Sequence, residues 1–344
     1  MTKYHLKLIS LLIIIIIVGC SKSDKENKST GYDSSKAYES VEIKDQNISL
    51  RYNLEKGDKY SYKLTTITNA LESIQADSLI KSNSSQNLQY IFNLEVIEID
   101  EEKVAEIAIN ISSVKVSANI NGQKISFDTK ANPSKEEQEK FLEYSAISNS
   151  PYRARISPKG EVIEVSRLDK MIDKMISIQS QQQKLSTEER AQLAKNLSNA
   201  AVRPLTQLIF RELPEKQIAK DSTWERRYPS QMTVFTLENI AKFKVDDFFE
   251  IDGDKAAKIS ADLSVTYTGN KKGEQEGVKY SFDDPKMSGD GFIIYNIDKG
   301  ILIKSETTTN VEISVEVLAK DSMQKLRKTK RKENSTNKNI VELI

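Results

Sequence analysis

The residue types best suited to chemistry in this sequence are paired carboxylates, at Asp246-Asp247, Asp252/Asp254 and Asp283-Asp284. A glycosidase needs only two carboxylates that flank a sugar. Most of these aspartates, however, fall in stretches that the sequence predicts as turns. Asp252-Gly253-Asp254 is typical of a hairpin turn and lacks the ligand spacing and terminal Glu of an EF-hand calcium loop. A carboxylate-dependent hydrolase is therefore only the third hypothesis for function.

Other catalytic residue types are scarce. The only histidine is His5, and the only cysteine is Cys20. Because His5 lies in a predicted leader, the remaining chain has no imidazole for Ser-His-Asp or Cys-His catalysis and none of the usual zinc or copper ligand sets. The sequence also has no Gly-rich phosphate-binding motif. We therefore predict a protein that is not an enzyme and that uses no metal or other cofactor.

Residues 1–19 are predicted to form a signal peptide. Two lysines precede an apolar run of 11 residues from Leu8 to Val18, whereas a membrane-spanning helix needs about 20. The run ends in Ile17-Val18-Gly19-Cys20, which resembles the lipobox of bacterial lipoproteins. The resemblance implies that Cys20 is acylated on its sulfur and, after cleavage, on its amine. Two or more acyl chains give stable anchoring. The alternative is an ordinary signal peptide with an incidental cysteine.

The lipoprotein resemblance also implies a location in the cell envelope. Ser21 follows the cysteine, whereas an Asp there favours inner-membrane retention in such proteins, so we expect the outer membrane, on its periplasmic face or at the cell surface. Loss of the leader's two lysines leaves 49 cations against 50 acids, a balance that does not indicate a nucleic-acid partner. With a single cysteine the chain cannot form an intramolecular disulfide, and its core must stabilise the fold.

The chain behind the leader shows the alternation of half-buried strands. One predicted strand alternates isoleucines with small or polar residues, at Ile107, Ile109 and Ile111. The last predicted strand has a longer alternation, with one face formed by Val311, Ile313, Val315 and Val317. Hairpin turns are predicted between such strands, for example at Glu55-Lys56-Gly57-Asp58.

The second half of the chain repeats turn and strand features of the first half in the same order. The matching segments are 54–60 with 218–224, 98–103 with 250–255, 107–111 with 259–263, 126–128 with 281–283, and 159–163 with 299–303. The sequence therefore predicts an α+β fold, mainly antiparallel β, with two repeated β units forming a curved sheet packed on a helical insert between them.

The expected division of the chain follows from this repeat and from composition. It comprises the leader 1–19, a flexible tether 20–42, a first β unit 43–165, a helical insert 166–211, a second β unit 212–320 and a basic, disordered tail 321–344. Two Ser-x-x-Glu capping boxes, Ser134 with Glu137 and Ser186 with Glu189, predict helix starts. The insert supplies candidate pocket-lining residues, namely Met171, Met175, Leu193 and Leu197. Ordinary core packing is the alternative role for them.

A second resemblance lies at the start of the second β unit. Leu213-Pro214 followed by Asp221-Ser222-Thr223-Trp224 is similar to a Leu-Pro…Gly-Asp-Ser-Trp motif in a family of uncharacterised envelope lipoproteins. The similarity extends over about residues 45–318, and Asp221 replaces the family's glycine. Since that family has no established activity, the resemblance implies an architecture and no mechanism.

The predicted tail concentrates positive charge. Six cations fall within eight residues, at Lys325, Arg327, Lys328, Lys330, Arg331 and Lys332. Beside a membrane, each cation near anionic head groups contributes about 1 kcal/mol, so the tail is a candidate contact with an anionic surface. The alternative is a solvated end that contacts nothing.

Two functional classes remain for the folded part. The first is a membrane-anchored carrier that binds a lipid or another apolar or amphiphilic envelope molecule between sheet and helices. The alternative is a structural or interaction lipoprotein with a filled core and no small-molecule ligand. An open apolar cavity of a few hundred Å³, roughly the size of known ligand sites, distinguishes the first class from the second.

Substitution of the anchoring residue tests the lipoprotein prediction. We expect Cys20→Ala to move the protein from the membrane fraction to the soluble fraction, because the acyl chains supply the attachment. Fractionation followed by immunoblotting measures this shift. An intact mass that shows an unmodified cysteine in the wild-type mature protein would contradict the prediction.

Overall fold

The computed structural model describes residues 32–33, 36, 38–41, 47–179, 185–231, 235–275, 277–320 and 324–344. The predicted leader and Cys20 lie outside these residues. Within the described chain, none of the helices combines the length and apolar character needed to cross a bilayer.

Strands dominate the described chain, with 58% of residues in strands and 15% in helices. The strands are β1 (Lys59–Gln75), β2 (Leu79–Ile99), β3 (Ala105–Ile120), β4 (Gln123–Asp128), β5 (Tyr152–Ile156), β6 (Val162–Ser166), β7 (Thr223–Gln231), β8 (Thr236–Ile251), β9 (Asp254–Thr268), β10 (Lys272–Gln275), β11 (Val278–Phe282), β12 (Lys286–Asn296), β13 (Ile301–Lys320) and β14 (Leu326–Leu343). The helices are α1 (Lys135–Lys140), α2 (Leu142–Ile147), α3 (Asp169–Ile178), α4 (Thr187–Leu197), the π-helix η1 (Ser198–Val202) and α5 (Arg203–Ile209).

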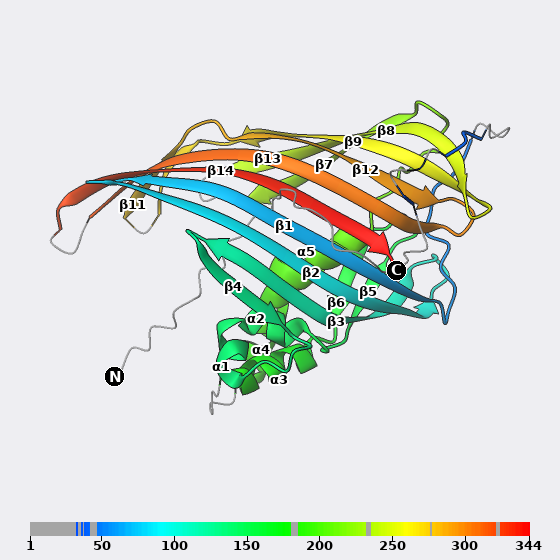
Figure 1. The fold of residues 1–344 in the computed structure, drawn as a ribbon, viewed down its shortest axis with the longest axis horizontal. Coiled ribbons are helices and arrows are strands. Elements are labelled where there is room, and N and C mark those ends of the chain that lie inside the picture. The colour runs from blue at the N-terminus through cyan, green and yellow to red at the C-terminus, as the bar shows by residue number, and fades with distance from the viewer. Residues whose placement is uncertain are drawn as a thin grey trace.

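All 14 strands belong to one antiparallel sheet, whose main path is β6-β5-β3-β2-β1-β14-β13-β12-β9-β8-β7. The sheet arches over the helices, as Figure 1 shows. The predicted α+β class is therefore wrong. The helices are few and short, and the strands form one continuous sheet instead of two separate β units with a helical insert between them.

The two halves nevertheless have the same strand order, β1-β2-β3-β5-β6 in the first and β7-β8-β9-β12-β13 in the second. Ile107 on β3 and Ile259 on β9 both lie on the third strand of their half, as the repeat predicts. Ile107 pairs with Val96 on β2, and Ile259 pairs with Val245 on β8. In each half the strand register shifts immediately after this valine. The halves differ in their short strands, because β4 pairs with β3 whereas β11 pairs with β13.

Strand β14 joins the halves, and it overturns the predicted disordered tail. It pairs with β1 from Tyr62↔Leu343 to Gln75↔Lys330, and with β13 from Lys304↔Glu342 to Lys320↔Leu326. A central strand has backbone partners on both sides, so its N–H and C=O groups are satisfied although its side chains are polar. Long pairing on two sides stabilises a segment whose composition alone predicts disorder.

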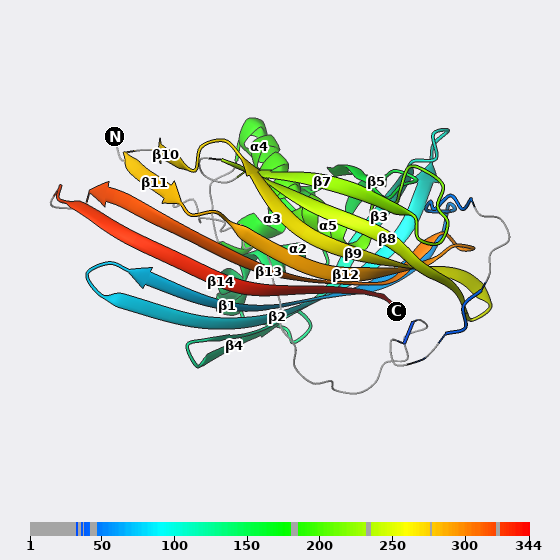
Figure 2. The same cartoon turned by 90° about the horizontal axis from the view of Figure 1, so that it is seen from above.

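Two of the helices, α1 and α4, begin where the sequence predicts. Ser134 caps α1 and Ser186 caps α4, and both capping boxes are formed, which confirms these two predicted starts. Pro204 lies in the first turn of α5, where a missing N–H costs little, and the π-helix precedes it. In Figures 1 and 2 the helices lie on the concave side of the sheet, and the far ends of β1, β2, β13 and β14 project beyond them.

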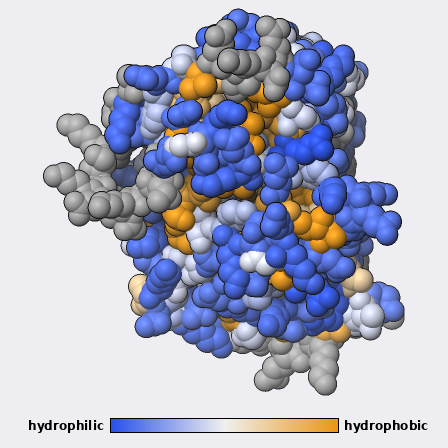
Figure 3. Space-filling model, turned by 90° about the vertical axis from the view of Figure 1, so that its right-hand side faces the viewer, coloured by the Kyte–Doolittle hydropathy of each residue, from blue (hydrophilic) through white to orange (hydrophobic). Residues whose placement is uncertain are grey.

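The concave face, here called the inner face, carries the main core. Tyr62, Leu64 and Val341 from the sheet and Met171 and Ile172 from α3 are fully or almost fully buried in one cluster. At the end of the sheet opposite the projecting hairpins, the strands are joined by polar turns. Figure 3, which views that end, shows hydrophilic residues over most of the surface and hydrophobic residues in the seams between them.

Part of the predicted tether is also packed. Tyr32 and Tyr38 stack on each other with ring centroids 5.1 Å apart and contact Phe249 and Phe292 of the second half. The amide of Val41 donates to the Phe248 carbonyl. Flexibility is therefore the wrong description for the described residues of this segment, since stacked aromatic rings bury apolar surface that the polar composition concealed.

Truncation tests the role of β14. We expect deletion of residues 325–344 to abolish the cooperative thermal unfolding transition, because it exposes the paired edges of β1 and β13 in the middle of the sheet. Circular dichroism during heating measures the transition. The double substitution Arg327→Gln/Lys328→Gln, at the tip of the same strand, is the control and should leave Tm nearly unchanged. A truncated protein that melts like the wild type would disprove this role.

Candidate binding site on the inner face of the sheet

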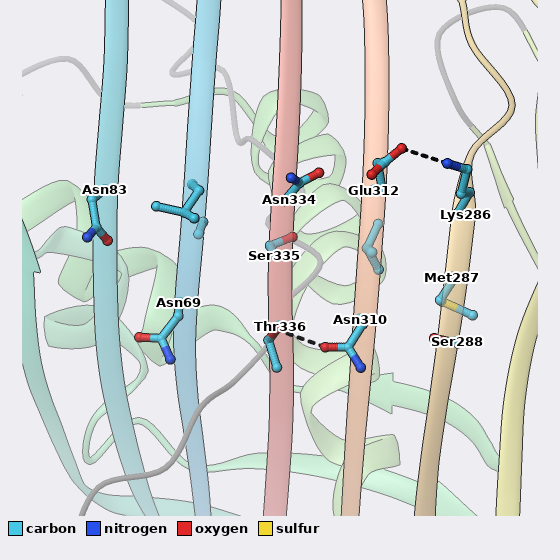
Figure 4. Close-up of a pocket in the computed structure, with 13 residues that line it drawn as sticks. Asn69, Asn83, Lys286, Met287, Ser288, Asn310, Glu312, Asn334, Ser335 and Thr336 are labelled. Atoms are coloured by element: carbon cyan, nitrogen blue, oxygen red, sulfur yellow. Dashed lines mark hydrogen bonds and ion pairs between the residues drawn. The ribbon is translucent and has the colours of Figure 1, made fainter.

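One hollow lies on the outer face of the sheet and is lined mostly by polar residues. It has a volume of about 450 Å³ and extends across β1, β2, β12, β13 and β14. Figure 4 shows asparagines from four positions around it, together with the Lys286–Glu312 ion pair at 2.9 Å and a bond from Thr336 to Asn310. Its width and shallow shape give little enclosure for an apolar ligand.

The other hollows described do not match the predicted pocket. Two open ones of about 430 and 490 Å³ are lined largely by polar residues of β2–β4 with α1 and of β10–β13. An enclosed one among Tyr52, Tyr60 and Tyr62 measures about 10 Å³, roughly the space of one water molecule. None of these is lined by Met171, Met175, Leu193 or Leu197. Met171 is 1% exposed within the core, and the other three side chains pack against that core.

Four of the six candidate aspartates, Asp247, Asp254, Asp283 and Asp284, form ion pairs with lysines. Hydrogen bonds from Lys220 and then Ser40 lower the pKa of Asp247, and those from Lys299 and Asn296 lower the pKa of Asp254. The pKa of Asp283 is lowered by Ser314 and Lys330. A glycosidase acid requires the opposite shift. The described chain also contains no group of three or more metal-ligating side chains.

The six cations of the predicted tail lie at the start of β14 and the residue before it, and five have acidic partners on neighbouring segments. The pairs are Arg327–Asp77, Lys328–Glu316, Lys330–Asp283, Arg331–Glu72 and Lys332–Glu312. The sixth cation, Lys325, is not free either, because it also interacts with another group of the protein. These exposed pairs are worth little in stability, and the predicted contact with an anionic surface stays a prediction.

The inner face changes character along the strands. Beneath the helices it is apolar and buried, at Leu64 and Val341. A polar belt follows, in which β1, β14 and β13 contribute paired Thr and Asn side chains: Thr66, Thr68, Asn337, Asn339, Thr307 and Thr309. Beyond the belt the face is apolar again. This third part, here called the aliphatic zone, consists of Val311, Ile313, Val315 and Val317 on β13 with Tyr280 and Phe282 on β11.

The polar belt contains buried groups without partners. Thr66 donates to the Asn339 side-chain oxygen at 2.9 Å. Asn337, the next inner residue of β14, is 1% exposed, and neither its amide nitrogen nor its amide oxygen has a hydrogen-bond partner. Buried polar groups of native proteins are nearly always bonded, so this side chain lies where another polar group would be stabilised.

The aliphatic zone is only partly covered. Val311, Ile313, Val315 and Val317 are half-buried, and Ile313 and Val315 pack on a small cluster formed by Phe235, Leu237 and Phe282. At the neighbouring β1–β2 tip, Ile80 is 58% exposed. Arg331 and Glu72 form an ion pair on the same face between these two apolar areas. In both ribbon views no helix of the described chain lies under these strand ends.

An arginine lies between the helices and the polar belt. Arg211 follows α5, and its Nε donates to Ser305 Oγ on the inner face of β13 at 3.1 Å. Its Nη2 is sealed from solvent and has no partner among the described residues. Burial lowers the pKa of the guanidinium, and the nearby Tyr52 and Tyr228 act in the opposite direction.

Residues 102–302 match the model of a family of unknown function, DUF6263. The chain belongs to this family. No curated protein sequence matches it. Among solved structures, an outer membrane channel from Pseudomonas putida F1 is similar with a TM-score of 0.21 and 8% identity, over 88% of this chain and 100% of that one. OccK1 (OpdK) of Pseudomonas aeruginosa is similar with a TM-score of 0.18 and 8% identity, over 82% of this chain and 98% of that one. Scores this low provide no argument about function.

Sequence reasoning identified the aliphatic side of β13 but missed the belt and Arg211. The alternation from Val311 to Val317 was a sufficient signal for the former. Nothing in the local sequence indicates how Arg211 is partnered, because the groups around it come from β13, β7 and the segment before β1.

Two neighbouring asparagines test the belt. We expect Asn337→Val to raise the free energy of unfolding by about 1–3 kcal/mol, since it removes an unpartnered buried amide. Asn339→Val should lower it, because Thr66 loses its acceptor. Urea unfolding of the ligand-free protein measures both changes. Equal destabilisation by the two substitutions would show that Asn337 is bonded in the folded protein.

Proposed function

We propose that this chain is a non-enzymatic, outer-membrane-anchored lipoprotein that binds an apolar or amphiphilic envelope molecule on the inner face of its sheet. The observation that carries the proposal is the aliphatic zone, which continues the buried core surface past the polar belt and remains half-exposed. Fully burying a Val or Ile side chain is worth about 1.5–3 kcal/mol. A contiguous apolar surface of this kind typically marks an interaction site.

The anchor supports the same proposal through geometry. Cys20 is the predicted attachment point, and Tyr32 packs against the folded body only 12 residues later. Twelve extended residues reach at most about 40 Å, so an acylated Cys20 keeps the sheet close to the bilayer. An amphiphile from that bilayer is then a near source of ligand.

The second candidate is a structural lipoprotein without a ligand. The filled core under the helices favours it, because the predicted pocket residues pack there and the enclosed space among the tyrosines is about 10 Å³. The two candidates differ in what covers the aliphatic zone: an amphiphile in the first, and another protein or solvent in the second.

Two adjacent residues of β13 provide a matched test. Val317 pairs with Tyr280 and belongs to the inner face, whereas Leu318 pairs with Lys279 on the outer face. We expect Val317→Glu to weaken binding of a pyrene-labelled diacylglycerol roughly tenfold or more, because a carboxylate must be buried against hydrocarbon. Leu318→Glu should leave binding unchanged. Fluorescence titration of the domain without its leader and Cys20 measures affinity, and thermal unfolding confirms that both variants fold.

A wild-type domain that does not bind the labelled lipid would contradict the carrier proposal and favour the structural candidate. If Val317→Glu and Leu318→Glu weakened lipid binding equally, the binding site would lie outside the aliphatic zone. Mass spectrometry of lipids that co-purify with the domain provides an independent measurement.

A further inference from the structure

We propose that Arg211 binds the acidic group of the ligand, so that the inner face selects amphiphiles whose head group carries a phosphate or a carboxylate. This inference rests on the proposed function and names the class of molecule that the same site takes.

The backbone of Arg211 is held rigidly. Its N–H donates to the Tyr52 hydroxyl at 2.9 Å, and its carbonyl lies against Gly160 of the β5–β6 hairpin. Any Cβ at Gly160 would collide with that carbonyl and with the Tyr52 ring, and Gly160 also has a φ of +86° that favours glycine. The position is therefore fixed by two segments distant in sequence, as a ligand-binding residue requires.

The side chain of Arg211 has fewer hydrogen-bond partners than those of two other well-packed arginines. Arg203 donates to the Val162 and Ile163 carbonyls, and Arg226 bonds the Leu213 carbonyl and Glu215, although the Nε of each is also buried without a hydrogen-bond partner. Arg211 has only the Ser305 hydroxyl, and its Nη2 is buried and unpartnered. An uncompensated buried cation is costly, so the free protein retains an unmet requirement for an anion.

A phosphate or carboxylate meets that requirement best. The planar guanidinium presents parallel donors that match two oxygens of either group, and the charge-assisted bonds are stronger than those to a hydroxyl. The Arg211 side chain bonds the Ser305 hydroxyl, and among the described residues it forms no ion pair with a carboxylate.

The inner face beyond Arg211 fits the rest of such a molecule. Along β13 the inner residues are Ser305, then Thr307 and Thr309 of the polar belt, then Val311 at the start of the aliphatic zone. Six strand residues span about 20 Å, so a polar region of that length separates the guanidinium from the hydrocarbon surface. A head group with neutral polar atoms besides its acid can contact the unpartnered amide of Asn337. This spacing suits an amphiphile whose acid lies at the end of its polar part, away from the hydrocarbon.

The test compares three pyrene-labelled probes: phosphatidylglycerol, a free fatty acid and uncharged diacylglycerol. We expect Arg211→Gln to weaken phosphatidylglycerol binding roughly ten- to hundredfold, the loss typical of a bond to a charged group, and to leave diacylglycerol binding unchanged. Arg211→Lys should retain part of the preference for the anionic probes. Arg155→Gln, which removes an exposed arginine paired with Asp100, is the control and should change none of the affinities. The fatty acid distinguishes carboxylate from phosphate as the preferred group.

Stability provides a second readout that a purely structural arginine would not give. We expect the ligand-free Arg211→Met protein to have a Tm equal to or above that of the wild type, because the substitution removes an uncompensated buried charge. A strong decrease in Tm, or equal loss of all three probes in Arg211→Gln, would overturn the assignment of Arg211. Failure of the wild type to bind any probe would instead overturn the proposed function itself.

Discussion

The pairing of β14 with both β1 and β13 is the interaction on which the rest of the structure depends. Without it the two halves, each with its own five-strand path, have no shared edge. The strand is polar over most of its length, so its contribution is largely that of backbone hydrogen bonds made on both sides. Those bonds bring the inner rows of β1 and β13 into one continuous surface.

This continuous surface has three consecutive environments, and the helices cover only the first. Under α3 and α5 the sheet residues Leu64 and Val341 are fully buried, which provides the stable core. The belt around Asn337 is buried but poorly bonded, and the aliphatic zone from Val311 to Val317 is half-exposed. Stability is therefore concentrated beneath the helices, and the projecting part is where a ligand gains most from contact.

Arg211 and Asn337 show the same conflict between stability and binding. Each is a polar side chain in a buried place where the described chain supplies too few partners. Replacing such groups with apolar ones commonly stabilises a protein. The proposed ligand would complete their bonding. The candidate catalytic aspartates differ, because lysines of the chain already pair with Asp247, Asp254 and Asp283.

The sequence by itself determined the features that depend on near neighbours. Both capping boxes, the hairpin turn at Asp252-Gly253 and the common strand order of the halves follow from short local patterns. The segment Glu55–Asp58 forms a turn, but no strand precedes it, so the hairpin predicted there is wrong. Only the tertiary structure decided that residues 326–343 form a central strand, because β1, one of the two strands that pair with it, lies far away in the chain. The fold class was mistaken for the same reason: a single sheet results from pairing between the chain's two distant parts, and composition does not encode that pairing.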